Sequence, residues 1–181
     1  VNFSGPLHLV NPKGAPAFGR DAVTRCREIG ASVDTAFLCV PSAGVIDTAR
    51  DAIGAGIRNL VVISGGFAET GAEGASREAQ LEALCHEHGV RMLGPNCLGF
   101  RNNLARVALG SMPFVEQPST PSIGLISASG SVAVSAIKYG IAQGAGFTHV
   151  ISTGNEMNVT ISELIDYLVE IDEVRAIALF L

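Results

Sequence analysis

Residues 60–71 read LVVISGGFAETG, and this stretch decides which class of fold the chain adopts. Residues 60–63 are all aliphatic, and they run directly into a serine and two glycines. An unbroken aliphatic run indicates a strand covered on both faces, because a half-exposed strand alternates apolar with polar residues. The Ser-Gly-Gly that follows indicates a tight turn. The stretch therefore predicts one strand of a parallel α/β sheet.

The same pattern recurs on both sides of this stretch. Further apolar runs with strand character lie at residues 7–10, 35–40, 91–93, 123–126, 148–151 and 176–181. Apolar residues at helical spacing fill most of the intervals, and the last of these helices is opened by Thr160 and Glu163 in capping-box spacing. Strands that alternate with helices indicate right-handed βαβ units. We therefore predict an α/β fold with a parallel sheet, in which helices cover the strands on both faces.

Composition changes near residues 110–122, where SMPFVEQPSTPS brings together prolines and hydroxyl side chains. Such a segment is typical of a linker. We expect one unit over residues 1–118, with about four strands, and the beginning of a second over residues 119–181. The chain starts at Val1 without a methionine and finishes on the apolar run AIALFL. We therefore expect it to be a piece of a longer polypeptide.

The charge and cysteine content exclude several classes of function. A net charge of -5 with only 12 Lys and Arg argues against a broad nucleic-acid surface, because binding phosphates over a wide area needs a basic patch. No apolar run approaches the roughly 20 residues of a membrane span. The 4 cysteines form no C-x-x-C pair, so neither a metal site nor a disulfide framework is indicated. Reduced thiols favour a cytoplasmic location.

Small and polar residues follow each of the first four apolar runs. In open parallel sheets, ligands bind beyond the carboxyl ends of the strands. Glycine lets the backbone approach a ligand, and free amides at a helix start favour an anion. We expect all four turns on one rim, where they suit a phosphate-bearing nucleotide, although turns also use these residues simply to turn. The turns are NPKG at 11–14, PSAG at 41–44, SGGFAETG at 64–71 and GPNCLG at 94–99.

Individual residues of these turns allow narrower expectations. Lys13 is the only lysine of the first unit, so it is the candidate there for a lysine–phosphate contact, against an ordinary surface lysine. Glu69 is expected to cap the helix that follows it. Cys97 is either a nucleophile or a small polar turn residue. No turn matches G-x-G-x-x-G or G-x-x-x-x-G-K-[ST], so neither a dinucleotide fingerprint nor a P-loop is present.

A second candidate site follows the apolar run at 123–126. Ser129 is a candidate helix N-cap, which would leave the amides near Gly130 and Ser131 as a seat for an anion. Plain capping explains the same residues. A third reading is a nucleophile elbow, since S-x-S-x-S loosely resembles G-x-S-x-G, and this reading needs an acid and a histidine such as His149.

Taken together, the motifs resemble those of the NDP-forming acyl-CoA synthetases, which are similar to the alpha subunit of succinyl-CoA synthetase. The resemblance covers nearly the whole chain, and GGFAETG followed by GPNCLG is its most specific part. It implies a Rossmann-like CoA-binding domain followed by the start of a flavodoxin-like domain that takes part in phosphoryl transfer. The motifs are VNP at 10–12, CVPSAG at 39–44, ISGGFAETG at 63–71, GPNCLGFRN at 94–102, GLISASG at 124–130 and STGN at 152–155.

The resemblance also implies roles for single residues. Ser129 and Gly130 would stabilise a phosphohistidine whose histidine is expected downstream, because none of the chain's histidines falls at that position. The substrate-contacting tyrosine of the succinyl enzymes is Val134 here, and a glutamine common in the acetyl-type members is Ala128. The glycine-rich loop that normally precedes VNP is absent. The residues implied to line the CoA site are Lys13, Val40, Pro41, Ser42, Ile63, Ser64, Gly65 and Asn96.

The implied function is that of an acid–thiol ligase. Such an enzyme makes an acyl-CoA thioester from an organic acid, CoA and ATP through acyl phosphate and phosphohistidine intermediates. The intact parent would use ATP with Mg and an ATP-grasp domain or subunit, and would form an oligomer, whereas this segment alone would be inactive. Two alternatives stay open. One is a CoA- or acyl-CoA-sensing module of a protein acetyltransferase, and the other is a nicotinamide-binding Rossmann domain.

Overall fold

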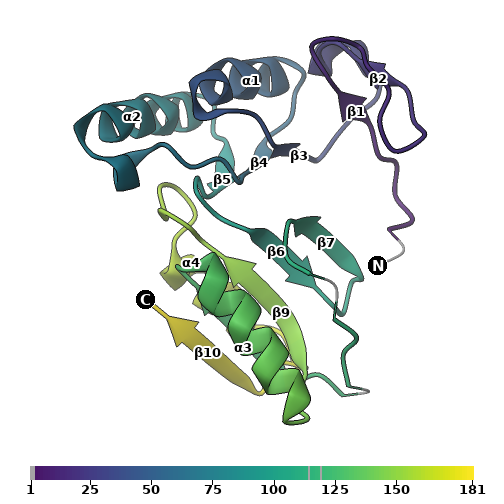
Figure 1. Ribbon diagram of the computed structural model, residues 1–181, viewed down its shortest axis with the longest axis vertical. Coiled ribbons are helices and arrows are strands. Elements are labelled where there is room, and N and C mark those ends of the chain that lie inside the picture. Colours follow the sequence, from purple (N-terminus) through teal and green to yellow (C-terminus); the bar gives the residue numbers. More distant parts are fainter. Residues whose placement is uncertain (1–2, 114, 119) are drawn as a thin grey trace.

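The structure is a computed structural model, and it describes residues 3–113, 115–118 and 120–181. Its first unit contains a parallel sheet in the order β3-β4-β5, with two helices side by side over one face (Figure 1). Residues predicted as strand or helix from apolar spacing fall in these elements. Their bounds are β3 Thr35–Leu38, α1 Ser42–Gly54, β4 Asn59–Val62, α2 Ala72–Glu87 and β5 Arg91–Leu93.

The first predicted strand lies outside this sheet. Strand β1 (Leu9–Val10) pairs in parallel with β2 (Ala22–Val23), and these two form a sheet of their own. The amide of Asn11 continues this pairing by donating to the carbonyl of Val23 at 2.9 Å. The prediction that all four turns share one rim was therefore wrong for the turn after β1. Two short 3-10 helices, η1 (Cys26–Glu28) and η2 (Ala68–Thr70), complete this unit.

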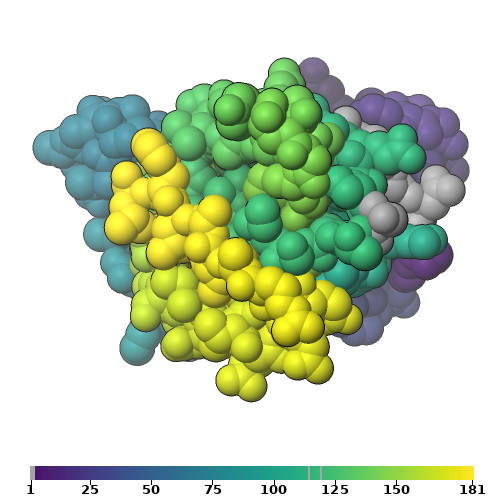
Figure 2. Space-filling view, turned by 90° about the horizontal axis from the view of Figure 1, so that it is seen from below, coloured from purple at the N-terminus to yellow at the C-terminus, as the bar shows by residue number. Residues whose placement is uncertain are grey.

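The second unit is a mixed sheet in the order β10-β8-β9-β6-β7. Strands β10, β8 and β9 are parallel, whereas β6 and β7 form an antiparallel hairpin that joins the sheet through β9. Helices α3 and α4 lie on opposite faces (Figure 1), and β10 runs along the surface of the molecule (Figure 2). The bounds are β6 Gly99–Asn102, β7 Val107–Gly110, β8 Ile123–Ser127, α3 Gly130–Ala142, β9 Phe147–Ser152, α4 Ile161–Val169 and β10 Ala176–Phe180.

The hairpin was not predicted from the sequence. Its strands are four residues long, and β6 carries Arg101, which is 4% exposed, so the apolar pattern of a strand is interrupted. The hairpin also precedes the expected unit boundary at 118/119 yet pairs with β9, which follows that boundary. The division into residues 1–118 and 119–181 stays a proposal, and residues 1, 2, 114 and 119 lie outside the described residues.

Alternating rows of side chains explain why β3, β4 and β5 are apolar throughout. Leu38 and Val62 pair with each other and belong to the core beneath α1 and α2. The opposite row, formed by Phe37, Val61 and Leu93, packs in a core with Ile151, Phe100 and Leu109 of the second unit. Helices α1 and α2 therefore cover one face of this sheet, and the second unit, including Leu164 of α4, covers the other face.

The segment predicted as a linker is attached to the second sheet. The side chain of Gln117 accepts a hydrogen bond from the amide of Phe147 at 2.8 Å, and its own amide donates to Val115. Met112 and Val115 pack against the core formed by β8, β9 and α3. These contacts of Met112, Val115 and Gln117 hold the connection against the second sheet.

Candidate functional site

The turns after β3, β4 and β5 meet at the carboxyl edge of the first sheet. The hydroxyl of Ser64 donates to the carbonyl of Val40 at 2.5 Å, and the amide of Asn96 donates to the carbonyl of Ser64 at 2.9 Å. These two hydrogen bonds link the three turns in series. Asn96 has a φ of 58° and its side chain is exposed, which directs the amide group away from the core.

Glycines at this edge make the close approach possible. Gly66 has a φ of +98°, and a Cβ added there would lie 2.6 Å from the hydroxyl oxygen of Ser42, the first residue of α1. A Cβ on Gly65 would lie 3.3 Å from the side-chain oxygen of Asn96. The turn after β4 therefore packs directly on both neighbouring turns, and Gly66, with its positive φ and the nearby Ser42 hydroxyl, disfavours any side chain.

The start of α1 offers backbone amides to a ligand. Its N-cap is Pro41, which makes no side-chain capping hydrogen bond. The first amides of a helix have no partner inside the helix, so those of Ser42 and Ala43 face outward at the positive end of the helix dipole. This 13-residue helix therefore presents an uncapped anion-binding end beside Ser64 and Gly66.

The amides of the turn after β4, in contrast, are already occupied. One oxygen of Glu69 accepts from Gly66 at 2.5 Å and from Phe67 at 3.2 Å, and Glu78 accepts from Ala68 at 3.2 Å. The expectation that Glu69 caps the following helix was wrong, because the N-cap of α2 is Gly71 without a side-chain bond. These three amides hold carboxylates of the protein, so they are not the amides offered to a phosphate.

Two effects of opposite sign act on the Glu69 carboxyl. Its partial burial would raise the pKa, because desolvation disfavours the charged form. Hydrogen bonds from Asn155 and from the backbone amides of Gly66 and Phe67 outweigh this effect, and the pKa of Glu69 is lowered. Glu69 is therefore held as an anion in this turn.

A loop of the second unit closes over the same edge. The amide of Asn155 donates to the carbonyl of Pro95 at 3.0 Å, and the side-chain nitrogen of Asn96 donates to the side-chain oxygen of Asn155 at 3.2 Å. Gly154 has a φ of +62°, and a Cβ there would overlap the carbonyl oxygen of Pro95. The STGN motif thus rests with its backbone directly on GPNCLG.

The candidate anion-binding site at the start of α3, formed by Ser129 and Gly130 (the α3 seat), has the predicted local structure. Ser129 is the N-cap, and its hydroxyl accepts from the amide of Val132 at 3.4 Å and lies 3.0 Å from the hydroxyl of Ser131. A Cβ on Gly130 would overlap the side chain of Leu98. Leu98 belongs to GPNCLG, so the start of α3 packs against the same motif that forms the carboxyl edge of the first sheet.

The nucleophile-elbow reading fails on geometry. His149 lies in β9 and pairs with Gly124 near the amino end of β8, whereas Ser129 follows the carboxyl end of β8. The His149 ring is buried and packs edge-on against Tyr167, with 5.8 Å between ring centroids. Burial lowers the pKa of this imidazole, which opposes protonation. His149 is therefore a core residue of the second sheet.

Lys13 belongs to the turn after β1, whose sheet is separate from the sheet that carries the other predicted CoA residues. It is exposed in the turn after β1, where its amide donates to the side chain of Asn11 at 2.9 Å. No side-chain hydrogen bond or ion pair joins it to the turns after β3, β4 and β5 within the described residues. Contacts thus bring together Val40, Ser42, Ser64, Gly65 and Asn96, with Pro41 and Ile63 adjacent in the chain, and leave Lys13 outside.

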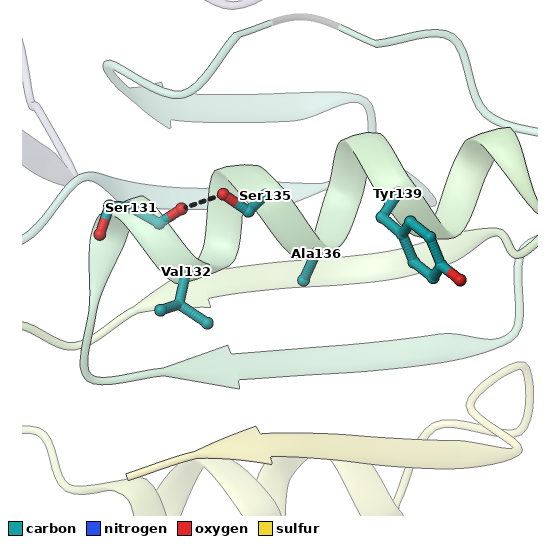
Figure 3. Close-up of a pocket in the computed structure, with 5 residues that line it drawn as sticks. All are labelled: Ser131, Val132, Ser135, Ala136 and Tyr139. Atoms are coloured by element: carbon teal, nitrogen blue, oxygen red, sulfur yellow. Dashed lines mark hydrogen bonds between the residues drawn. The ribbon is translucent and has the colours of Figure 1, made fainter.

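A surface hollow of about 380 Å³ begins beside the α3 seat (Figure 3). It follows the outer side of α3 from Ser131 to Tyr139, and the hydroxyl of Ser135 donates to the carbonyl of Ser131 at 3.0 Å. Tyr139 is 72% exposed. No helix among the described residues is long and apolar enough to span a membrane, and they contain no cluster of three potential metal ligands.

Sequence reasoning gave no individual role to three residues that complete the site, although Leu98 and Asn155 lie in the GPNCLG and STGN motifs. Leu98 joins the α3 seat to the first sheet, and Asn155 and Glu78 hold the turn after β4. Asn155 was detectable in principle, since it follows a strand as the other site residues do. Glu78 lies within α2 and gave no signal, because only the tertiary fold brings it to this turn.

Family comparisons agree with this architecture. The family described as "CoA binding domain" matches residues 2–103, and "Succinyl-CoA ligase like flavodoxin domain" matches residues 120–181. The chain is 32% identical to the alpha subunit of acetate–CoA ligase [ADP-forming] II from Pyrococcus furiosus, over 98% of this chain and 38% of that protein. It is 33% identical to a trans-feruloyl-CoA synthase from an unknown prokaryotic organism, over 98% of this chain and 26% of that protein.

A solved structure shows the same arrangement. The acetyl-coenzyme A synthetase 1 of Candidatus Korarchaeum cryptofilum, determined with phosphate and ADP, superposes with a TM-score of 0.92. It is 27% identical, over 99% of this chain and 38% of that chain. The present chain thus spans well under half the length of these relatives. From these matches, the chain belongs to the CoA binding domain family and continues into a succinyl-CoA ligase-like flavodoxin domain, as in the NDP-forming acyl-CoA synthetases.

Proposed function

We propose that this chain supplies the CoA-binding and phosphate-stabilising part of an NDP-forming acyl-CoA synthetase. The observation that supports the proposal is the contact between Leu98 and Gly130, because it brings the α3 seat next to GPNCLG, the motif proposed to hold CoA. An enzyme that passes a phosphoryl group to an acid and then joins the acyl group to a thiol needs both sites close together. The complete protein would therefore form an acyl-CoA from an organic acid, CoA and ATP.

Each site has a distinct task in this proposal. Ser42, Ser64 and Asn96 would hold CoA, and the uncapped start of α1 would favour its phosphates. Ser129 and Gly130, at the start of α3, would stabilise the negative charge of a phosphohistidine supplied by another part of the protein. ATP with Mg would bind to an ATP-grasp domain or partner subunit and supply the phosphoryl group. Lys13 stays a proposed CoA residue that would have to approach when CoA binds.

The resemblance implies a small carboxylic acid as the substrate, and the substrate class that we propose is no narrower than an organic acid. Identity to an acetate–CoA ligase subunit is 32%, and identity to a trans-feruloyl-CoA synthase is 33%, so similarity does not select between a small and an aromatic acid. We also propose a reducing compartment such as the cytoplasm, because all four cysteines are free thiols. The complete enzyme is proposed to be an oligomer.

Phosphate labelling tests the chemistry. The complete protein that contains this chain should incorporate labelled phosphate from ATP on a histidine, as an acid-labile and base-stable adduct. The 181-residue chain alone should not be labelled. Activity retained after the labelled histidine is changed to alanine would overturn the proposed mechanism. CoA binding without any phosphohistidine would instead favour a CoA-sensing module.

Ligand titration tests the binding step independently. Calorimetry of the complete protein should detect CoA binding, and Ser64→Ala should weaken it by removing the hydroxyl that ties the turn after β4 to Val40. NAD is the matched control ligand, because it also carries an adenosine diphosphate. Tight NAD binding without a response to CoA would reverse the assignment.

A further inference from the structure

The side chain of Asn155 uses all of its hydrogen-bonding groups at the boundary between the two units. Its nitrogen donates to the carboxylate of Glu69 at 2.6 Å and to that of Glu78 at 2.7 Å. Its oxygen accepts from the side-chain nitrogen of Asn96 at 3.2 Å. One amide group therefore joins residues of three segments that lie 59 to 86 positions away in the sequence.

The two carboxylates pass this restraint on to the backbone. Between them, Glu69 and Glu78 accept from the amides of Gly66, Phe67 and Ala68. These residues directly follow Ser64 and Gly65, which are part of the proposed CoA site. The position of the turn after β4 thus depends on carboxylates that Asn155 holds in place.

Asn155 is itself fixed by backbone contacts. The backbone amide of Asn155 donates to the carbonyl of Pro95 at 3.0 Å. On the other side of the loop, the backbone amide of Thr153 donates to the carbonyl of Ser127 at 3.0 Å. Ser127 ends β8 and precedes the α3 seat. The loop is therefore anchored both to the GPNCLG motif and to the strand that leads into α3.

We infer that Asn155 is a positioning residue for CoA binding, which holds the turn after β4 and the side chain of Asn96 in the geometry that accepts CoA. The inference rests on the proposed function, since it assigns Asn155 a task at the proposed CoA site. Without the Asn155 amide, the anions of Glu69 and Glu78 would face each other without a shared donor, and repulsion would move the turn.

The charged side chains near the Asn155 side-chain amide determine what a carboxylate at position 155 would do. Arg77 binds the carbonyl of Gly66 and the carboxylate of Glu73, so it does not neutralise the pair formed by Glu69 and Glu78. Glu156, next to Asn155, accepts from the amide of Ile161 at 2.6 Å. A carboxylate in place of Asn155 would therefore meet two further carboxylates, and among the residues the structure describes neither Glu69 nor Glu78 forms an ion pair.

Calorimetric titration of the complete protein with CoA tests the inference. Asn155→Ala should raise the dissociation constant about tenfold, and in turnover the KM for CoA should rise more than kcat falls. Asn59→Ala is the matched control, because it removes one asparagine hydrogen bond, to the carbonyl of Asp34 at 2.9 Å, at the opposite end of β4. The control should bind CoA as the wild type does.

Asn155→Asp adds a readout that loss of packing alone would not produce. The ratio of its dissociation constant to that of the wild type should rise as the pH is raised, because a carboxyl group added beside Glu69 and Glu78 repels them more once it has lost its proton. Taking the ratio at each pH cancels the titration of CoA itself. If Asn155→Ala fails to fold, this nearly isosteric variant decides, and a ratio that is independent of pH overturns the inference.

The outcomes separate the inference from the proposed function. Wild-type CoA binding with an unchanged constant for Asn155→Ala overturns the role of Asn155 and leaves the proposed function intact. A wild-type protein that does not bind CoA overturns the proposed function, and the role of Asn155 falls with it. A tenfold loss in Asn155→Ala, an unaffected Asn59→Ala and a pH-dependent ratio for Asn155→Asp together support the inference.

Discussion

The guanidinium of Arg91 lies 2.6 Å from the carboxylate of Glu163 and ties the start of β5 to the start of α4. The same carboxylate completes a capping box, because its other oxygen accepts from the amide of Thr160 at 2.9 Å. Both partners of the ion pair are about half exposed, at 51% and 45%. Glu163 thus serves two structures at once, and substitutions can separate its two contributions.

Glu163→Ala should lower the free energy of unfolding by about 1 kcal/mol, chiefly through the lost capping box. Glu163→Gln is the matched control, since an amide can still cap the helix but forms no ion pair, and an exposed ion pair is worth between about 0 and 1 kcal/mol. Urea denaturation measures both values. Equal losses in the two variants would show that the ion pair, and not the cap, carries the effect.

The contribution of Glu163 should also depend on pH. Hydrogen bonding from the Thr160 amide and then from Arg91 lowers the pKa of Glu163 below its ordinary value of 4.5. A lowered folded-state pKa stabilises the fold above the unfolded-state value, and this stabilisation is lost as the pH falls through the folded-state pKa. The difference between wild type and Glu163→Gln should therefore shrink below pH 4.5, and a constant difference would contradict this assignment.

Gly94→Ala should destabilise the protein by roughly 2 kcal/mol or more, because two costs add. Gly94 has a φ of +97°, and an added Cβ would overlap the carbonyl oxygen of Val62 and lie 3.2 Å from the Cys97 sulfur. Gly56→Ala is the matched control, with a φ of +92° and no atom within 4 Å of its added Cβ. Thermal denaturation should show a clearly smaller loss for Gly56→Ala, and equal losses would mean that backbone strain alone matters.

Gly130→Ala should cost about 1 to 3 kcal/mol of stability, because the added Cβ overlaps Leu98 and pushes the start of α3 away from GPNCLG. Combining it with Leu98→Ala removes the overlap, so the penalty of Gly130→Ala should become smaller in that background. Gly44→Ala controls for helix propensity, since Gly44 lies in the first turn of α1 and its nearest neighbour is 4.0 Å away. If the two substitutions changed the free energy of unfolding additively, the contact between Gly130 and Leu98 would be disproved.

Alkylation by iodoacetamide at pH 8 should modify Cys39 far faster than the other cysteines. Burial raises the pKa of Cys97 to about 11, and burial followed by a nearby carboxylate raises those of Cys26 and Cys85 to about 11. Such thiols are almost wholly protonated at pH 8. Cys39 is exposed, although burial of part of its side chain raises its pKa as well.

Protection of Cys39 then reports on the proposed CoA site. Cys39 directly precedes Val40, so acetyl-CoA, which has no free thiol, should slow its modification. Mass spectrometry of digested protein gives the modified positions, and Cys39→Ser should remove the fast reaction. Rapid modification of Cys97 in the folded protein would favour the interpretation of Cys97 as a nucleophile.

Sequence periodicity predicted the helices well, because their caps and stripes are local. Ser129 caps α3 as expected, and Thr160 with Glu163 forms the predicted capping box. The unbroken run at 60–63 correctly predicted the strand Asn59–Val62. The turns after β3, β4 and β5 were also identified, since carboxyl ends of parallel strands share one edge.

Other features depend on residues far apart in the chain, so no local pattern could reveal them. The hairpin β6–β7 is part of a sheet because β6 pairs with β9. Strand β1 lies outside the predicted sheet because it pairs with β2. The face of the β3-β4-β5 sheet opposite α1 and α2 was expected to carry helices, but the second unit covers it.

The amino-acid order by itself determined the local conformations and the chemical character of each turn, since these depend on neighbours within a few positions. Which amides remain open to a ligand depends both on Glu69, a neighbour in the chain, and on the tertiary structure, which brings Glu78 and Asn155 to the same turn. The carboxylates of Glu69 and Glu78 take those of Gly66, Phe67 and Ala68, whereas no side chain caps the start of α1. The physical reason is that a backbone amide donates to whichever acceptor lies within reach, whether that acceptor is a neighbour in the chain or a residue that the fold brings near.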